Sequence, residues 1–231
     1  MRRFLILIFV FNGYLVDAQD TDPTTIPKIQ EYAEQMLAAI KQIGHKISES
    51  KTDHFLYLSK NWQHTTVITT TDEYLHFDGR YNILRNALEA NLGEELYRIN
   101  AWQIKAARIG DRLLVPLSAK LIEEGNIMKF FEVLSSGKLT LLQQFSVGSR
   151  VEGGNSPIAT MTGETVYYIS TDFYYTKDFT SLKKLKRNKN RILELFGEES
   201  DDLDAYMDEN GLKFRKDEDV IQVFEQFNNG H

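Results

Sequence analysis

Histidine is the residue type in this chain best suited to metal binding or proton transfer. His76 and Asp78 stand two positions apart, a spacing that places both side chains on one face of a β-strand and offers a metal ion two ligands at most. A polar pair beside a turn accounts for them better, so we predict no metal site, no cofactor and no catalytic residue. The histidines are too widely spaced for a local ligand motif: His45, His54, His64, His76 and His231.

An acidic stretch near the C-terminal end has the composition of a calcium loop without its spacing. The run Asp201–Asp204 is followed by Asp208–Gly211. An EF-hand loop needs a glycine at its sixth position and a bidentate Glu at its twelfth, and Gly211 stands fourth when the count starts at Asp208. The sequence therefore predicts the solvated face of a helix.

A basic stretch, Lys183–Arg191, precedes the acidic one. Such a run can bind phosphate, anionic lipid or a glycan. It also fits the solvent side of a helix whose leucines point inward, which is the interpretation we favour. Because residues 177–196 are net basic and 197–210 are net acidic, we expect the two segments to pack as neighbours.

Aromatic residues are the remaining chemical signal. Adjacent aromatics on a strand point to opposite faces, so we expect one member of each pair in the core and the other exposed or covered by a helix. Exposed strand aromatics could stack on sugars, and coverage by the terminal helices explains them as well. The residues concerned are Trp62, Trp102, Phe130–Phe131, Tyr167–Tyr168 and Tyr174–Tyr175.

Motifs of common enzymes are absent from the sequence. The chain contains no glycine-rich phosphate loop, no G-x-S-x-G nucleophile elbow and no zinc-protease helix motif. It has no cysteine, which excludes disulfides and thiol chemistry, so a hydrophobic core must hold the fold. The sequence leaves enzymatic activity open and favours a non-enzymatic protein.

Residues 1–18 have the features of a cleavable signal peptide. A positively charged start is followed by the apolar run Phe4–Phe11. Val16 and Ala18 fit a small-residue cleavage site, so we expect Gln19 to be the mature N-terminus. Because the apolar run is shorter than the roughly 20 residues that cross a bilayer, we expect an exported, soluble mature protein without a transmembrane span.

The charge balance of the chain is acidic. The formal net charge is −6, and removal of residues 1–18 takes away Arg2, Arg3 and Asp17 and makes it more negative. Phosphate binding needs a basic surface, so we expect no nucleic-acid partner.

Apolar residues recur with helical spacing at both ends of the chain. Residues 26–50 carry a stripe that includes Ala33, Met36, Leu37 and Ile40, which predicts an amphipathic helix packed on the core. A partner-binding or membrane-surface helix is the alternative. Three short helices are expected over 181–228, capped by Ser181, Ser200 and Asp217, with inward-facing Leu193, Phe196, Val223, Phe224 and Phe227.

From about residue 55 the apolar period changes to two, and turn signals recur, which predicts antiparallel sheet. We expect hairpin turns at Asp78–Gly79, Gly110–Asp111 and Ser135–Lys138. A glycine-rich bend at Glu152–Asn155 precedes predicted strands at Glu164–Ile169 and around Phe173–Tyr175.

These patterns predict an α+β fold. Its antiparallel β-sheet is expected to form a sandwich or a partly closed barrel, with an N-terminal amphipathic helix and a C-terminal three-helix unit. The predicted parts are a signal peptide at 1–18, a flexible start and helix at 19–54, an antiparallel β-domain at 55–176 and a C-terminal helical unit at 177–231.

A resemblance to a group of known proteins rests on three segments. They are Glu132–Leu142, Tyr167–Ile169 and Leu182–Phe227, the last with Leu212-Lys213-Phe214. Over about residues 62–228 the chain resembles uncharacterised exported proteins of Bacteroidetes-type bacteria, a family without assigned activity. The resemblance implies the periplasm or the cell surface of a Gram-negative bacterium. The chain lacks the anchoring cysteine of lipoprotein relatives and an obvious C-terminal sorting domain, so we expect a periplasmic protein, with a cell-surface or extracellular location as the alternative.

The function expected from the sequence is that of a non-enzymatic accessory or binding module of the cell envelope, with another envelope protein as its partner. The alternative is a periplasmic hydrolase or a glycan-binding protein whose pocket only the fold assembles. A pocket lined by His76, Asp78 or paired carboxylates would favour the alternative.

Overall fold

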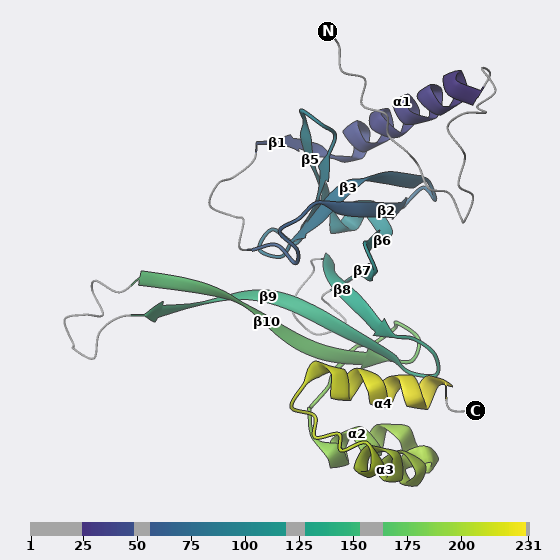
Figure 1. Cartoon of the computed structure of the whole chain (residues 1–231), viewed down its shortest axis with the longest axis vertical. Helices are drawn as coiled ribbons and strands as arrows, with labels where there is room; N and C mark the ends of the chain where they lie inside the picture. The colour runs from purple at the N-terminus through teal and green to yellow at the C-terminus, as the bar shows by residue number, and fades with distance from the viewer. Residues whose placement is uncertain (1–24, 49–55, 119–127, 153–163, 230–231) are drawn as a thin grey trace.

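The computed structural model describes residues 25–48, 56–118, 128–152 and 164–229 (Figure 1). The predicted signal peptide with its cleavage site lies outside these residues, as do Gly153 and Gly154 of the predicted bend. The described helices are α1 (Thr25–Ile43), α2 (Lys189–Phe196), α3 (Ser200–Glu209) and α4 (Asp217–Asn229), with short 3-10 turns η1 (Ala101–Gln103) and η4 (Gly197–Glu199).

The strands of the described residues form one antiparallel sheet. In their spatial order they are β1 (His45–Ile47), β5 (Leu96–Asn100), β4 (Ala87–Asn91), β3 (Tyr74–Asn82), β2 (Gln63–Thr69), β6 (Ile104–Ile109), β7 (Arg112–Ser118), β8 (Met128–Ser135), β9 (Thr140–Glu152), β10 (Glu164–Thr176) and β11 (Lys183–Lys184).

Strands of the sheet are added on both sides of β2. Strands β3, β4 and β5 follow on one side of it, and η1 returns the chain so that β6 pairs with its other edge. Strands β7 to β11 then pair in sequence order. The described sheet ends in the edges β1 and β11 and is not closed into a barrel, and the predicted α+β class with its antiparallel sheet is confirmed.

One core lies between α1 and the N-terminal half of the sheet. Alternation along β3 puts Phe77 and Tyr81 on one face, where they join Ile40 of α1 in a single buried cluster. Phe130 of β8 belongs to the same cluster, with its ring centroid 5.2 Å from that of Tyr81. The Asn86 side chain accepts a hydrogen bond from the Phe130 backbone N–H at 3.1 Å, which holds β8 against the β3–β4 turn.

A second core lies under the C-terminal helices, at the far end of the molecule from α1 (Figure 1). The Phe196 ring contacts Phe224 and Phe227, at centroid distances of 5.4 and 4.5 Å. Asn228 accepts from the Leu139 backbone N–H at 3.1 Å and donates to the Leu139 carbonyl at 2.9 Å, so α4 is bonded to the residue just before β9. The predicted inward orientation of the large apolar groups is confirmed.

The predicted turn at Asp78–Gly79 is wrong. Both residues lie inside β3, where Asp78 is paired with Asn91. The chain turns instead between β2 and β3, where Asp72 has a left-handed φ of 66°. A Cβ on Gly79 would lie 2.7 Å from Thr65 Oγ1, so glycine is required here by a close contact rather than by a turn.

Two other predicted turns are confirmed. Gly110, with φ 59°, and Asp111 connect β6 to β7, and Ser135–Lys138 connects the paired strands β8 and β9. The two strands predicted within 164–175 form the single strand β10.

Helix boundaries differ from the prediction at two places. The helix predicted over 26–50 ends at Ile43, and β1 follows it. The helix predicted from Ser181 begins only at Lys189, where the Asn188 side chain accepts a hydrogen bond from the Arg191 backbone N–H. Part of the intervening segment forms β11 and pairs with β10.

Candidate functional site

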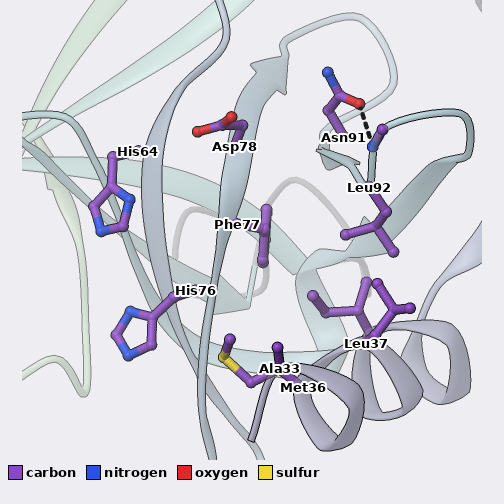
Figure 2. Close-up of a pocket in the computed structure, with 11 residues that line it drawn as sticks. Ala33, Met36, Leu37, His64, His76, Phe77, Asp78, Asn91 and Leu92 are labelled. Atoms are coloured by element: carbon purple, nitrogen blue, oxygen red, sulfur yellow. Dashed lines mark hydrogen bonds between the residues drawn. The ribbon is translucent and has the colours of Figure 1, made fainter. Parts of the chain in front are cut away.

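A cavity of about 500 Å³ lies where α1 crosses the sheet near the start of β3 (Figure 2). Helix α1 and the residues at the end of β4 form its apolar part, and β2 and β3 add histidine and aspartate side chains. Its lining residues are Ala33, Met36, Leu37, Ile40, His64, His76, Phe77, Asp78, Asn91, Leu92 and Gly93.

The apolar side of the cavity follows from the periodicity of α1. Met36 and Ile40 are one helical turn apart and both are buried, so they point toward the sheet. Leu37 is 38% exposed although it lies on the cavity side of the helix. Figure 2 shows Leu37 and Met36 on α1, across the cavity from Phe77 of β3. The helix therefore covers this part of the sheet without filling the space beneath it.

The strand register opens the cavity. Strand β4 pairs with β3 only from Asp78 onward, and its last residue, Asn91, stands opposite Asp78. Among the described strands, Tyr74–Phe77 of β3 is paired on its β2 side alone. The chain turns after Asn91, and the Gly93 backbone N–H donates to Asn91 Oδ1 at 3.0 Å, the bond dashed in Figure 2.

Two histidines line the polar side of the cavity. The His64 and His76 rings are nearly parallel, with an interplanar angle of 4° and centroids 6.2 Å apart. His64 stands opposite Asp78 in the β2–β3 pairing, so His64, His76 and Asp78 share one face of the sheet. The predicted placement of His76 and Asp78 on one strand face is confirmed, whereas the turn that was expected beside them is absent from β3.

The electrostatics of the histidine pair favour a neutral His76. Burial, and secondarily the charge of the nearby His64, lowers the pKa of His76 below its usual value. Its Nδ1 is 3.0 Å from the Thr66 hydroxyl, which can donate to it or accept from it according to the tautomer. A neutral imidazole offers one donor and one acceptor, so this side of the cavity can bind either polarity of hydrogen-bonding group.

The described residues contain no group of three or more His, Asp or Glu side chains that could hold a metal ion. Of the five histidines, His54 and His231 lie outside the described part of the chain, and His45 is exposed on β1. The sequence pattern identified His76 and Asp78 but missed the cavity, because its apolar side comes from α1, far away in the sequence.

The charged stretches contact each other. Lys189 bonds to Asp204 at 2.6 Å and to Asp208 at 2.5 Å, which confirms the predicted attraction between the basic and acidic segments. Arg187 is likewise bound, to Asp217 at 2.6 Å. The acidic run lies on α3, in agreement with the predicted helix face.

One member of each aromatic pair is expected in the core, and the pair Tyr167–Tyr168 is the exception. Phe130 and Phe131 are both buried, in two clusters on opposite faces of the sheet. Tyr174 is buried, whereas Tyr167 and Tyr168 are 50% and 46% exposed on β10. The exposed pair lies on the long ribbon of β9 and β10 that extends beyond the other strands (Figure 1).

No helix within the described ranges is long and apolar enough to cross a membrane. Comparison with known proteins finds no matching family model, no matching curated protein and no matching solved structure. The resemblance noted from the sequence stays a prediction.

Proposed function

We propose that the mature chain is an exported binding module of the cell envelope that holds a small molecule in the cavity between α1 and β3. The observation that carries this proposal is the cavity itself, which joins the apolar side chains of α1 to His64, His76 and Asp78. A pocket of this kind was named in the alternative expected from the sequence, a periplasmic hydrolase or a glycan-binding protein whose pocket only the fold assembles.

The size and lining of the cavity support a ligand with an apolar body and one polar end. Its volume of about 500 Å³ falls within the range of roughly 300–1,000 Å³ that small-molecule sites occupy. Met36, Leu37 and Phe77 would bury the apolar body, at about 0.8 kcal/mol for each methylene removed from water. The cavity reaches the other face of β3 at the edge that β4 leaves unpaired, and there the imidazoles and the Asp78 carboxylate would bind the polar end.

Binding is a better account of the cavity than hydrolysis. No hydroxyl or amine side chain is among the described residues that line it, so a serine, threonine or lysine nucleophile is missing from its wall. Thr66, whose hydroxyl contacts His76, is not part of the lining. A hydrolytic role would be supported instead if the protein turned over a nitrophenyl ester and lost that turnover in Thr66→Val and His76→Gln.

The binding test uses the mature chain and the apolar probe N-phenyl-1-naphthylamine. Its fluorescence should rise saturably with the wild type and at least tenfold more weakly with Ala33→Phe, because the added ring fills the cavity. Ala38→Phe is the matched control, since Ala38 is exposed on the same helix and does not line the cavity. Equal binding by both variants would contradict the proposal.

Export to the periplasm is the second part of the proposal. It is supported by the positive start, apolar run and small-residue cleavage pattern of residues 1–18. The intact mass of the protein recovered from a periplasmic fraction should correspond to a chain beginning at Gln19. Retention of residues 1–18 in a membrane fraction would contradict both the cleavage and the location, and recovery from the medium would favour the extracellular alternative.

A partner among the envelope proteins remains the expectation from the sequence. In-cell crosslinking followed by affinity purification of the mature chain tests it. A single protein recovered in stoichiometric amount would support an accessory role, and recovery of none would leave the small molecule as the ligand to identify.

A further inference from the structure

We infer that a second hollow, beside the first cavity, is a subsite for a neutral saccharide, with Trp62 as its stacking platform. The hollow has a volume of about 430 Å³ and lies between β1 and the turn that joins β4 to β5. It shares Asn91 and Gly93 with the first cavity but has a different lining. The inference does not depend on the ligand of the first cavity.

The lining of this hollow is polar around one large aromatic ring. Trp62 is half-buried, and Asn91, Glu94 and Lys46 surround the space with amide, carboxylate and ammonium groups. Sugar rings present apolar C–H faces to an indole, and their hydroxyls both donate and accept hydrogen bonds. An indole ringed by donors and acceptors matches those two properties together, whereas the first cavity has an apolar wall and no indole.

Trp62 is held in position by the Arg80 guanidinium, which stacks on both the Trp62 and the Tyr57 rings. The Arg80 guanidinium carbon lies 4.0 Å from the centroid of the Trp62 ring and 3.9 Å from that of Tyr57. A cation against one side of the indole restricts its rotation and leaves the rest of its surface to line the hollow. The platform is therefore ordered before a ligand arrives, which lowers the entropy cost of binding.

The Arg80 guanidinium is itself fixed by a buried network. Its Nε and Nη2 both donate to Glu89 Oε2, at 3.2 and 3.0 Å, and its Nη2 also contacts the Tyr57 hydroxyl at 3.0 Å. Arg80 and Glu89 are 6% and 2% exposed, so water competes little for these bonds. A fixed aromatic supported from behind by a buried ion pair is what a stacking site requires.

The charges of the hollow favour an uncharged ligand. Glu95 is bound by Lys41 at 2.9 Å and by Lys46, and these lysines lower its pKa to about 2, so it remains ionised at all physiological pH values. The ammonium groups thus offset Glu95, and the Glu94 carboxylate adds a negative charge at the edge. The two lysines and the two glutamates balance, so the hollow has no net charge to attract an anionic sugar or a nucleotide phosphate, and a neutral sugar needs none.

The two tryptophans of the chain allow a direct test. Trp102 is 63% exposed on η1 and does not line the hollow, so Trp102→Phe leaves Trp62 as the sole indole. Titration of this variant with cellotriose, maltotriose and tri-N-acetylchitotriose should give a saturable change in indole emission with at least one of them. No saturable change with any of the three would overturn the inference.

Substitutions in the otherwise native chain locate the site by calorimetric titration with the sugar that binds. Trp62→Ala should weaken binding at least tenfold, and Trp62→Phe, which keeps an aromatic ring over Arg80, should retain most of it. Asn91→Ala, which leaves the aromatic stack intact, should weaken it several-fold. Trp102→Ala is the control, and a loss there equal to that in Trp62→Ala would overturn the assignment.

A last variant separates this inference from the proposed function. Ala33→Phe fills the first cavity and should leave saccharide binding unchanged, because Ala33 does not line the second hollow. If Ala33→Phe abolishes naphthylamine binding while the sugar still binds, both assignments stand. If sugar binding is lost together with naphthylamine binding, the hollow is not an independent subsite and the inference is wrong.

Discussion

Arg80 and Glu89 form an ion pair in the interior of the sheet, opposite each other on β3 and β4. Removing two charges from water is costly, and the cost is offset only where the remaining hydrogen-bonding groups find partners. Here the Tyr57 hydroxyl donates to Glu89 Oε2 at 2.9 Å, and Asn82 donates to Oε1 at 3.1 Å. Burial, reinforced by the hydrogen bond to Glu89, raises the pKa of Tyr57 to about 12, so this hydroxyl remains a donor.

Arg80→Ala should therefore lower the free energy of unfolding by about 3–5 kcal/mol, because it leaves the Glu89 carboxylate buried without its cation. Urea unfolding followed by circular dichroism measures the change. Lys105→Ala is the control, since Lys105 and Asp72 are 48% and 74% exposed and such pairs contribute only about 0–1 kcal/mol. Equal losses in the two variants would show that the buried ion pair contributes no more to the free energy of unfolding than the exposed pair does.

The lowered pKa of His76 has a consequence for stability. Because the folded protein binds the proton less tightly than the unfolded chain, stability is lost as the pH falls below about 6.5, the ordinary histidine value, toward the lowered one. His64→Gln should raise the pKa of His76 but leave it below the ordinary value, because burial is the larger cause. Titration of the imidazole resonances by NMR measures both; no change in His64→Gln would mean that the two rings do not interact.

The sequence identifies individual side chains of the candidate site but not their neighbours in the fold. The spacing of His76 and Asp78 was enough to put them on one strand face. It could not show that Met36 and Leu37, about 40 positions earlier, would line the same cavity from the other side of β3. Trp62 stands out in the sequence as an aromatic residue, but its stack with Arg80 requires a strand pairing that only the fold supplies.

The turn wrongly predicted at Asp78–Gly79 shows where a local sequence signal is overridden by strand pairing. An Asp-Gly pair suits a two-residue hairpin turn, yet β3 continues through both residues because β4 pairs with this stretch. The glycine is retained for packing, since an added Cβ would approach Thr65 Oγ1 to 2.7 Å and Phe77 Cε2 to 2.9 Å.

Gly79→Ala should accordingly destabilise the protein by roughly 1–3 kcal/mol through overpacking. Asp78→Asn, at the exposed neighbouring position, should change the unfolding free energy by no more than about 0.5 kcal/mol. Thermal and urea unfolding of the two variants compare them directly. A harmless alanine at position 79 would mean that the neighbouring side chains relax freely around it.

The helix predicted from Ser181 failed for a reason visible in two leucines. Leu182 and Leu185 are three positions apart, which places them on one face of a helix. In the fold they belong to clusters on opposite faces of the sheet, Leu182 with Phe131 and Leu185 with Phe173. Leucines on either side of a short edge strand, buried on opposite faces of the sheet, can thus imitate a short amphipathic helix in the sequence.

The helices that follow behave as their periodicity predicts. Phe224 of α4 is fully buried and contacts the Phe196 ring. Phe224→Ala should cost about 3–5 kcal/mol, the usual range for a large aromatic removed from a core. The melting temperature measures the loss, with the exposed neighbour Glu225→Ala as control. An unchanged melting temperature would mean that this tail is a docking surface rather than part of the core.

One sheet supports two large cores and a small third cluster, which consists of Phe131, Leu142, Tyr174 and Leu182. The cluster beneath α1 includes Phe77 and Phe130, and the cluster beneath the C-terminal helices includes Leu141 and Phe224; the two share no buried side chain among the described residues. Strands β8 and β9 connect them, because Phe130 and Phe145 enter the first cluster while Leu141 enters the second. The alternation of apolar and polar residues predicts which side chains are buried, but not which cluster each of them joins.

This division predicts local rather than global loss of stability. In Phe224→Ala, amide hydrogen exchange should accelerate in α2, α3 and α4 and just before β9, where Asn228 bonds to Leu139. The amides of β2, β3 and β4 should keep their protection, because their side chains pack in the other cluster. Exchange measured by mass spectrometry on peptides from both regions distinguishes the outcomes. An equal loss of protection in β3 and α4 would mean that the continuous sheet makes the two cores unfold as one cooperative unit.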